Sequence, residues 1–174
     1  MFWLQIASNF LKILREGQTP RQVAGGFALG SIVGLSPALT LQGLLLWLII
    51  LILDVNLSAA ILAFTLFSMV AYLLDPVFHH LGYWLLADME GLKDLWTSLY
   101  NAPLAPLTRF NNTVVLGSFL SAIALSPGVY FGMKQFVSAY RTHLHARIQQ
   151  WRLYQLISKS VLVRWYQKVR DITG

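Results

Sequence analysis

The chain contains three long stretches without a charged residue: Gln22–Leu53, Val55–Leu74 and Phe110–Met133. A helix that crosses a bilayer needs about 20 mainly apolar residues. The second and third stretches therefore each predict one membrane span, over residues 57–74 and 111–133. The first stretch is too long for one straight span and too short for two.

The first stretch is interrupted near its middle by Ser36-Pro37. Proline removes an amide donor and disfavours the helical conformation of the residue before it. We expect two short helices, over 20–35 and 39–53, each about 20–24 Å long and thus shorter than the roughly 30 Å hydrocarbon core. This length favours a re-entrant hairpin over 20–53. One kinked and steeply tilted span is the alternative.

Local signals predict where several helices begin. Thr19-Pro20 and Asp75-Pro76 each place a capping side chain before a proline at the first helical position. Asn56 and Asn111-Asn112 can cap the helices that follow them. We expect an external segment over 75–110, which contains a loop at 101–106.

Both ends of the chain show amphipathic patterns. Residues 1–16 predict an interfacial helix, with Phe2, Trp3 and Ile6 on its apolar side. Apolar residues recur at the helical period through 134–174, which predicts a basic cytoplasmic tail helix. Its candidate contacts with anionic lipid are Lys134, Arg141, Arg152, Lys159 and Arg170. Packing of the apolar stripe on a partner's helix is the alternative, and nucleic acid is not an expected partner.

Composition and charge fit an integral membrane protein. Of the 174 residues, 56% are hydrophobic and 11% charged, whereas a soluble domain is about 25% charged. The chain has no cysteine, which excludes disulfides and thiolate chemistry. Cations concentrate in 1–22 and 134–174, and acids in 75–109. The positive-inside rule then places both termini in the cytoplasm. We expect an all-α, polytopic membrane fold with two spans plus the hairpin, or four crossings as the alternative.

Gly26, Gly30 and Gly34 form two overlapping GxxxG units within the first stretch. Small residues four apart let another helix backbone approach closely. We expect tight helix packing here, within one chain or across a dimer. A groove that admits a lipid tail is the functional interpretation of the same pattern.

The tripeptide Leu35-Ser36-Pro37 recurs as Leu125-Ser126-Pro127. Two proline-interrupted segments are typical of broken helices, whose exposed ends bind ions or polar groups within a membrane. Together with Gln42, these serines and prolines form a candidate broken-helix site. This site favours the alternative function, a small transporter or channel for a lipid or small solute.

Other candidate chemistry is sparse. Asp75 and His79 share a helix face and His80 is adjacent, a pattern possible for a metal site or proton relay. However, Asp75 is better explained as a helix cap, and adjacent histidines diverge by about 100° around a helix. The sequence shows no hydrolase, zinc-protease or nucleotide-binding motif. We expect no enzymatic activity, no cofactor and no metal.

An ordered set of motifs resembles the bacterial membrane family called domain of unknown function 2062. The matching elements, over about residues 19–86, are Thr19-Pro20, Phe27-Ala-Leu-Gly30, Gly34-Leu-Ser-Pro37, Leu41-Gln42, Asn56-Leu-Ser-Ala-Ala60 and Asp75-Pro76. The chain departs from the family pattern at Ala38-Leu39-Thr40, where a glycine is common, and at Asp75-Pro76, where Asn-Pro is typical. Asp75-Pro76 with Gly82 and Leu85 is most similar to a short branch of the family.

The resemblance implies an inner-membrane protein. Some members are fused to glycosyltransferase domains, and members of the short branch tend to be encoded beside a large envelope-spanning protein. It assigns no activity and therefore no catalytic residue. We expect an accessory or anchoring component of envelope lipid or glycolipid handling. Its expected partners are membrane lipids, anionic on the cytoplasmic face, and a larger envelope membrane protein or a second copy of the chain.

Overall fold

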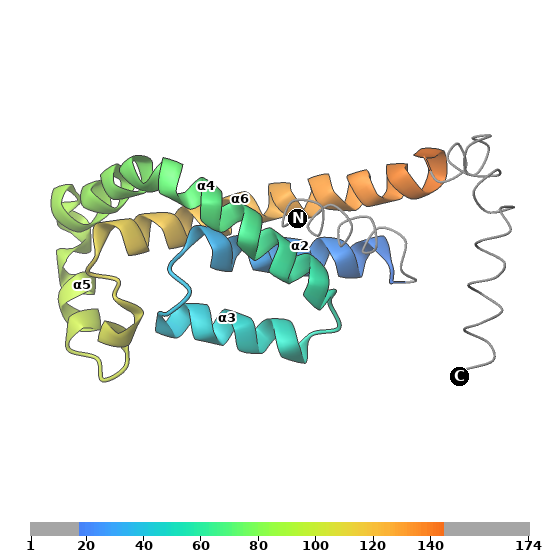
Figure 1. Ribbon diagram of the computed structural model, residues 1–174. Coiled ribbons are helices and arrows are strands. Elements are labelled where there is room, and N and C mark those ends of the chain that lie inside the picture. Colours follow the sequence, from blue (N-terminus) through green and yellow to red (C-terminus); the bar gives the residue numbers. More distant parts are fainter. Residues whose placement is uncertain (1–17, 145–174) are drawn as a thin grey trace, which may run out of the picture.

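The computed structural model describes residues 18–144, and every regular element in this range is a helix (Figure 1). The α-helices are α2 (Pro20–Leu35), α3 (Leu41–Ile52), α4 (Leu57–Tyr83), α5 (Lys93–Tyr100) and α6 (Thr113–Ala139). Single helical turns follow α4 (η1, Trp84–Asp88; η2, Glu90–Leu92), precede α6 (η3, Ala105–Thr108) and extend it (η4, Tyr140–Leu144). The all-α prediction is confirmed over the described range.

Three predicted helix starts are confirmed by their caps. Thr19 accepts a hydrogen bond from the amide of Gln22 (3.2 Å), and the Gln22 side chain accepts one from the Thr19 amide (2.8 Å). Asn56 and Asn112 cap α4 and α6 in the same way, through the amides of Ala59 and Val115. Each cap satisfies an amide that the helix itself leaves without a partner.

Helix α2 is the centre of the molecule. Ten of its 16 residues are buried, and it packs along both α4 and α6 (Figure 1). One buried cluster joins Val23 of α2 with Leu62 of α4 and Val137 of α6, and a second joins Ile32 with Phe78 and Ala122. Helix α3 runs antiparallel to α2 on the outside of this bundle and buries only Gly43 and Ile50.

The GxxxG glycines place α2 against the main chain of α4. A Cβ atom added to Gly26 would lie 2.2 Å from the carbonyl oxygen of Asn56, and one on Gly30 would lie 2.1 Å from that of Ala60. At Gly34 it would lie 2.7 Å from the carbonyl oxygen of Phe64. The two helices are therefore parallel and in backbone contact. The space beside these glycines, expected either to pack a helix or to admit a lipid tail, is taken by α4.

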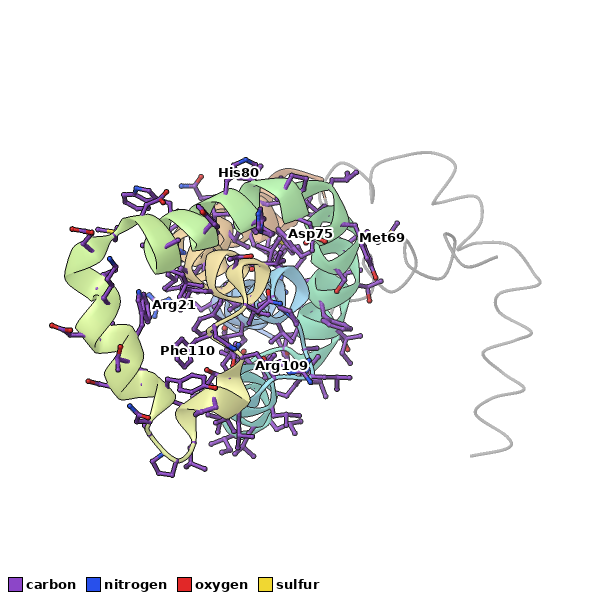
Figure 2. All side chains as sticks on the ribbon, turned by 90° about the vertical axis from the view of Figure 1, so that its left-hand side faces the viewer. Arg21, Met69, Asp75, His80, Arg109 and Phe110 are labelled. Carbon is purple, nitrogen blue, oxygen red and sulfur yellow. The ribbon has the colours of Figure 1, made fainter. Side chains whose placement is uncertain are left out.

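Asp75-Pro76 does not begin a helix, contrary to the sequence-based expectation. Helix α4 continues through Pro76 to Tyr83 and then into η1. The predicted external segment, residues 75–110, therefore begins inside the same long helix as the predicted span 57–74. The amide missing at Pro76 is the one that would donate to the carbonyl of Tyr72. Figure 2 shows α4 changing direction in this region, with Asp75 on the inner side of the bend.

Ser126-Pro127 does not break α6, which runs from Thr113 to Ala139. Pro127 cannot donate to the carbonyl of Ile123. The hydroxyl of Ser126 donates to that carbonyl instead, at 2.8 Å. The helix therefore keeps its direction, and the predicted broken-helix pair reduces to the first elbow alone.

Helix α6 and η4 continue through Lys134 and Arg141, so no break in the helix separates the span predicted over 111–133 from the basic tail predicted to follow it. The predicted interfacial helix 1–16 lies outside the described residues. So do the tail beyond residue 144 and three of its candidate lipid contacts, Arg152, Lys159 and Arg170.

The end of the molecule that carries α5 forms an open ring around the start of α6. Figure 2 shows the second half of α4, then α5 and η3, passing around this point. Trp96 of α5 stacks on Phe110 at 5.9 Å between ring centroids and donates its indole N–H to the carbonyl of Leu85 at 3.0 Å. Gly82 and Gly117 bring the main chains of α4 and α6 into contact beside the ring. These contacts hold the short α5 segment to the two long helices.

Candidate functional site: the pocket at the elbow

The elbow between α2 and α3 is built by local hydrogen bonds. Ser36 leaves the helix in an extended conformation, and its hydroxyl donates to the carbonyl of Ile32 at 2.7 Å. The hydroxyl of Thr40 donates to the carbonyl of Pro37 at 2.9 Å and accepts from the amide of Gly43 at 3.3 Å. The chain therefore reverses direction over a few residues and starts α3 with a capped turn.

A pocket of about 460 Å³ lies beside the elbow. It is bounded by the end of α2, the middle of α4 and the first two turns of α6. Its lining residues are Gly34, Leu35, Ser36, Pro37, Ala38, Phe64, Ser68, Ala71, Tyr72, Asp75, Val114 and Ser118. This volume lies in the range of pockets that bind small organic molecules.

The serine hydroxyls among the lining residues each give their proton to a carbonyl of their own helix. Ser36 donates to the carbonyl of Ile32, Ser68 to that of Phe64 at 2.7 Å, and Ser118 to that of Val115 at 3.2 Å. Each hydroxyl has one proton and two lone pairs. Because the proton is used within the same helix, the oxygen is left with acceptor capacity.

Asp75 supplies the only ionisable carboxylate among the lining residues, and none of them carries a cationic side chain. It is partly buried on the inner side of α4 (Figure 2). The pocket is therefore negatively charged when Asp75 is ionised.

Two prolines near the pocket each leave a helix carbonyl without its usual amide donor. Pro37 cannot donate to the carbonyl of Val33 in the last turn of α2, and Pro76 cannot donate to that of Tyr72. The carbonyl end of a helix also carries a partial negative charge. The end of α2 and the carboxylate of Asp75 thus act in the same sense and favour a positively charged group.

The structure gathers some predicted site residues and separates others. Ser36 and Pro37 line the pocket, together with Gly34 from the glycine motif. Gln42 does not. Its side chain donates to the carbonyl of Thr108 at 3.0 Å and so ties α3 to η3. Ser126 and Pro127 are not lining residues either.

Sequence reasoning missed Ser68, Tyr72 and Ser118, and for Asp75 it favoured a helix cap over a metal site or proton relay with His79. Asp75 was still conspicuous, because a charge at the end of an apolar stretch is costly unless it has a role. The serines gave no signal, since their pairing with the elbow depends on how three helices pack.

The opposite end of the bundle has a separate polar cluster. The side-chain amide of Gln22 donates to the carboxylate of Asp54 at 2.7 Å, and the main-chain carbonyl of Gln22 accepts from the amide of Asn56 at 3.0 Å. Arg141 donates to the carbonyl of Gln18 at 2.7 Å. These bonds join the starts of α2 and α4 to the end of α6 and leave the elbow pocket at the other end of α2.

The histidines near Asp75 have separate partners. The Nδ1 atom of His79 lies 2.7 Å from the hydroxyl of Thr113, and that of His80 lies 2.6 Å from the carbonyl of Pro76. Among residues 18–144, no group of three or more histidine, aspartate or glutamate side chains could hold a metal ion.

Comparison with known proteins gives a family and no function. The model of a family described as "uncharacterized protein conserved in bacteria", domain of unknown function 2062, matches residues 5–146. A protein of Treponema pallidum (strain Nichols), described as an uncharacterized protein, is 26% identical over 156 residues, which cover 90% of this chain and 96% of the relative. No solved structure matches. The match over most of the chain shows that this protein belongs to the bacterial family of domain of unknown function 2062.

Proposed function

We propose that the chain is an integral protein of the bacterial inner membrane in which α4 and α6 cross the bilayer and α2 and α3 form a re-entrant hairpin. The helical segments Leu57–Asp88 and Thr113–Thr142 are long and apolar enough to cross. The exposed surface of α3 supports the same proposal. Its exposed large side chains are Leu44, Leu45, Leu48, Ile49, Leu51 and Ile52, a contiguous apolar surface that is unfavourable in water.

The lengths of the two helices favour a re-entrant hairpin over four crossings. Helix α2 has 16 residues and is about 24 Å long, less than the roughly 30 Å core. Helix α3 has 12 residues and is shorter still. Neither arm of the hairpin is therefore long enough to cross the hydrocarbon core.

Charge supports an orientation with both termini in the cytoplasm. Arg21 and Arg141 lie at the end where α2 begins, and Asp88, Glu90 and Asp94 lie between α4 and α6 at the other end. Cations collect on the cytoplasmic side of membrane proteins.

Cysteine labelling tests this topology. An impermeant maleimide applied to intact spheroplasts is expected to label Ser98→Cys, whereas Leu53→Cys and Thr142→Cys are labelled only after permeabilisation. Leu53 separates the hairpin from one kinked span over 20–53, because that span would place it outside. Labelling of Leu53→Cys from outside would overturn the hairpin.

Within this topology, we propose an accessory or anchoring role for a larger membrane assembly of envelope lipid or glycolipid handling. The observation that carries it is the limited burial of α3, which buries two residues and exposes a row of leucine and isoleucine side chains. The surface fits transmembrane helices of a partner, which pack on apolar helices within the bilayer.

Site-specific photocrosslinking distinguishes a protein partner from lipid. A photoreactive residue at Leu48 of α3 is compared with one at Met69 of α4, because their exposures are nearly equal, at 52% and 50%. We expect a crosslink to a large membrane protein from Leu48 only. Native mass spectrometry of the gently extracted protein should show the same partner at fixed stoichiometry. Lipid adducts alone from both positions would remove the accessory role.

The elbow pocket supports a second function, a small transporter or channel. Its carboxylate and acceptor groups lie beside a broken helix, as in transporters whose binding sites form at such breaks. Cysteine scanning over residues 36–42 is expected to find water-accessible positions in the bilayer. Uniform inaccessibility of these positions would remove this function.

A further inference from the structure

We propose that the elbow pocket binds a primary ammonium group attached to a small apolar body. This inference deepens the second proposed function, because it names the ligand class of the same pocket. It does not require that the ligand be transported.

The hydrogen-bonding character of the pocket selects a donor. The hydroxyl protons of Ser36, Ser68 and Ser118 are all given to carbonyls of their own helices. Their oxygens and the Asp75 carboxylate are acceptors among the lining residues. A primary ammonium has three donors and no acceptor, so it matches this set.

The net charge of the pocket favours a ligand with a single positive charge. Asp75 is the single ionisable carboxylate of the lining, and no lining side chain is cationic. One ammonium neutralises one carboxylate, whereas a divalent ion would remain uncompensated where burial makes an unpaired charge costly.

The size and walls of the pocket select an organic cation over a bare ion. A volume of about 460 Å³ is far larger than a monovalent metal ion requires. The remaining walls come largely from apolar side chains, among them Leu35, Phe64, Ala71 and Val114. Tyr72, one turn before Asp75 on α4, also lines the pocket and adds an aromatic ring to its walls.

Two sources carry a primary ammonium group: an aminophospholipid, whose phosphate must then stay outside the pocket, and a soluble alkylamine, which carries the apolar body directly. The experiment uses full-length protein in two arms. In the first, calorimetry measures binding of butylammonium to the detergent-solubilised protein, with butanol as the uncharged control. In the second, nanodiscs of equal phosphatidylethanolamine and phosphatidylglycerol are used, and native mass spectrometry counts the lipids retained by the protein.

Variants separate the pocket from the rest of the chain. Asp75→Asn is expected to weaken binding at least tenfold in the arm that detects it, whereas Asp75→Glu keeps part of it. Asp54→Asn is the matched control, because Asp54 is bonded to Gln22 at the opposite end of the bundle and should bind like the wild type. Ala71→Phe leaves the carboxylate in place but fills the pocket, and should also abolish binding. This variant keeps the test decisive if Asp75→Asn does not fold.

Binding of butylammonium alone assigns a soluble amine, and selective retention of phosphatidylethanolamine assigns the lipid headgroup. Absence of both in the wild type overturns the inference, as does equal binding by wild type, Asp75→Asn and Ala71→Phe. The cysteine scan of residues 36–42 tests the transport function separately. Binding without water access along the elbow would keep the ammonium site and remove the transporter.

Discussion

Ser36 and Ser126 each precede a proline, and each donates its hydroxyl proton to an earlier carbonyl of its own helix. Ser126 bonds Ile123, the carbonyl that Pro127 leaves without an amide donor. The hydroxyl of Ser36 donates to the carbonyl of Ile32, which already accepts from the Ser36 amide at 3.1 Å. The carbonyl of Val33, which Pro37 leaves without an amide donor, therefore receives no hydrogen bond from this serine. Where the serine bonds the carbonyl that the proline leaves without a donor, as in α6, the helix continues. Where it bonds another carbonyl, as in α2, the helix ends.

We predict that Ser126→Ala destabilises the protein more than Ser36→Ala. The first change removes the side-chain donor that replaces the missing amide, and such a loss costs about 1–3 kcal/mol. The second leaves Ile32 with the amide of Ser36 as donor. Unfolding in mixed micelles, followed by tryptophan fluorescence, measures both. Equal destabilisation would contradict the explanation.

Gly30 gives a sharper prediction, because its absent Cβ is what allows α4 to approach. In Gly30→Ala the new atom would lie 2.1 Å from the carbonyl oxygen of Ala60, and main-chain atoms cannot yield as a flexible side chain does. We expect a loss of about 3 kcal/mol or more in the free energy of unfolding.

Gly132→Ala is the matched control for Gly30. Its added Cβ meets nothing within 4 Å, and it lies in the interior of α6. Replacing a helical glycine by alanine in open space gains about 0.5–1 kcal/mol. The same unfolding experiment should therefore move the two variants in opposite directions.

Helix boundaries show what the sequence could predict. The starts of α2, α4 and α6 depend on side chains within three residues of the cap, so Thr19, Asn56 and Asn112 are readable locally. The end of α2 at Ser36-Pro37 is local as well. Asp75-Pro76 has the same pattern as Thr19-Pro20, a capping residue before a proline, but it lies inside α4. Residues 57–74 already form helix before it, so the chain continues that helix and does not begin a new one.

The elbow pocket could be predicted only in part. Ser36 and Pro37 were identifiable as a helix break, but Ser68 and Ser118 reach the pocket because α4 and α6 pack on either side of α2. The bond between Gln42 and Thr108 joins residues 66 positions apart. A single sequence contains no local pattern for such a pairing.

The contact of Gln42 with Thr108 leads to a prediction for α3 and η3. Gln42→Ala removes the 3.0 Å bond that ties the first turn of α3 to the segment before α6. We expect faster hydrogen exchange over residues 105–112 and at the start of α3, with little change in α2, because local openings depend on the contacts that close them. Gln135→Ala, on an exposed position of α6, is the control. Unchanged exchange in both segments would show that the bond does not hold them.

The molecule as a whole is closed at one end by Arg141. This side chain lies in η4, which extends α6, and donates to the carbonyl of Gln18, just before α2. The bond joins residues 123 positions apart. It holds the ends of the described bundle together, and α2 remains enclosed between α4 and α6.

We predict that Arg141→Leu lowers the melting temperature of the protein in detergent. A hydrogen bond from a charged donor contributes about 1.5–3 kcal/mol, and each kcal/mol corresponds to roughly 2–4 °C in a chain of this size. Lys134→Leu, on the same helix, is the control and should change the melting temperature less. Differential scanning fluorimetry of the tryptophans measures both variants.

The central position of α2 has a consequence for how the protein is made. Its buried face needs α4 for its glycines and α6 for its remaining apolar side chains. Synthesis runs from the amino terminus, so the helix at the centre of the bundle leaves the ribosome before both helices that enclose it. The hairpin is also too short to span the bilayer by itself. Nascent chains that stop before Thr113 should therefore hold α2 without one of the two helices that enclose it, and the hairpin can reach its final place only after α6 has been inserted.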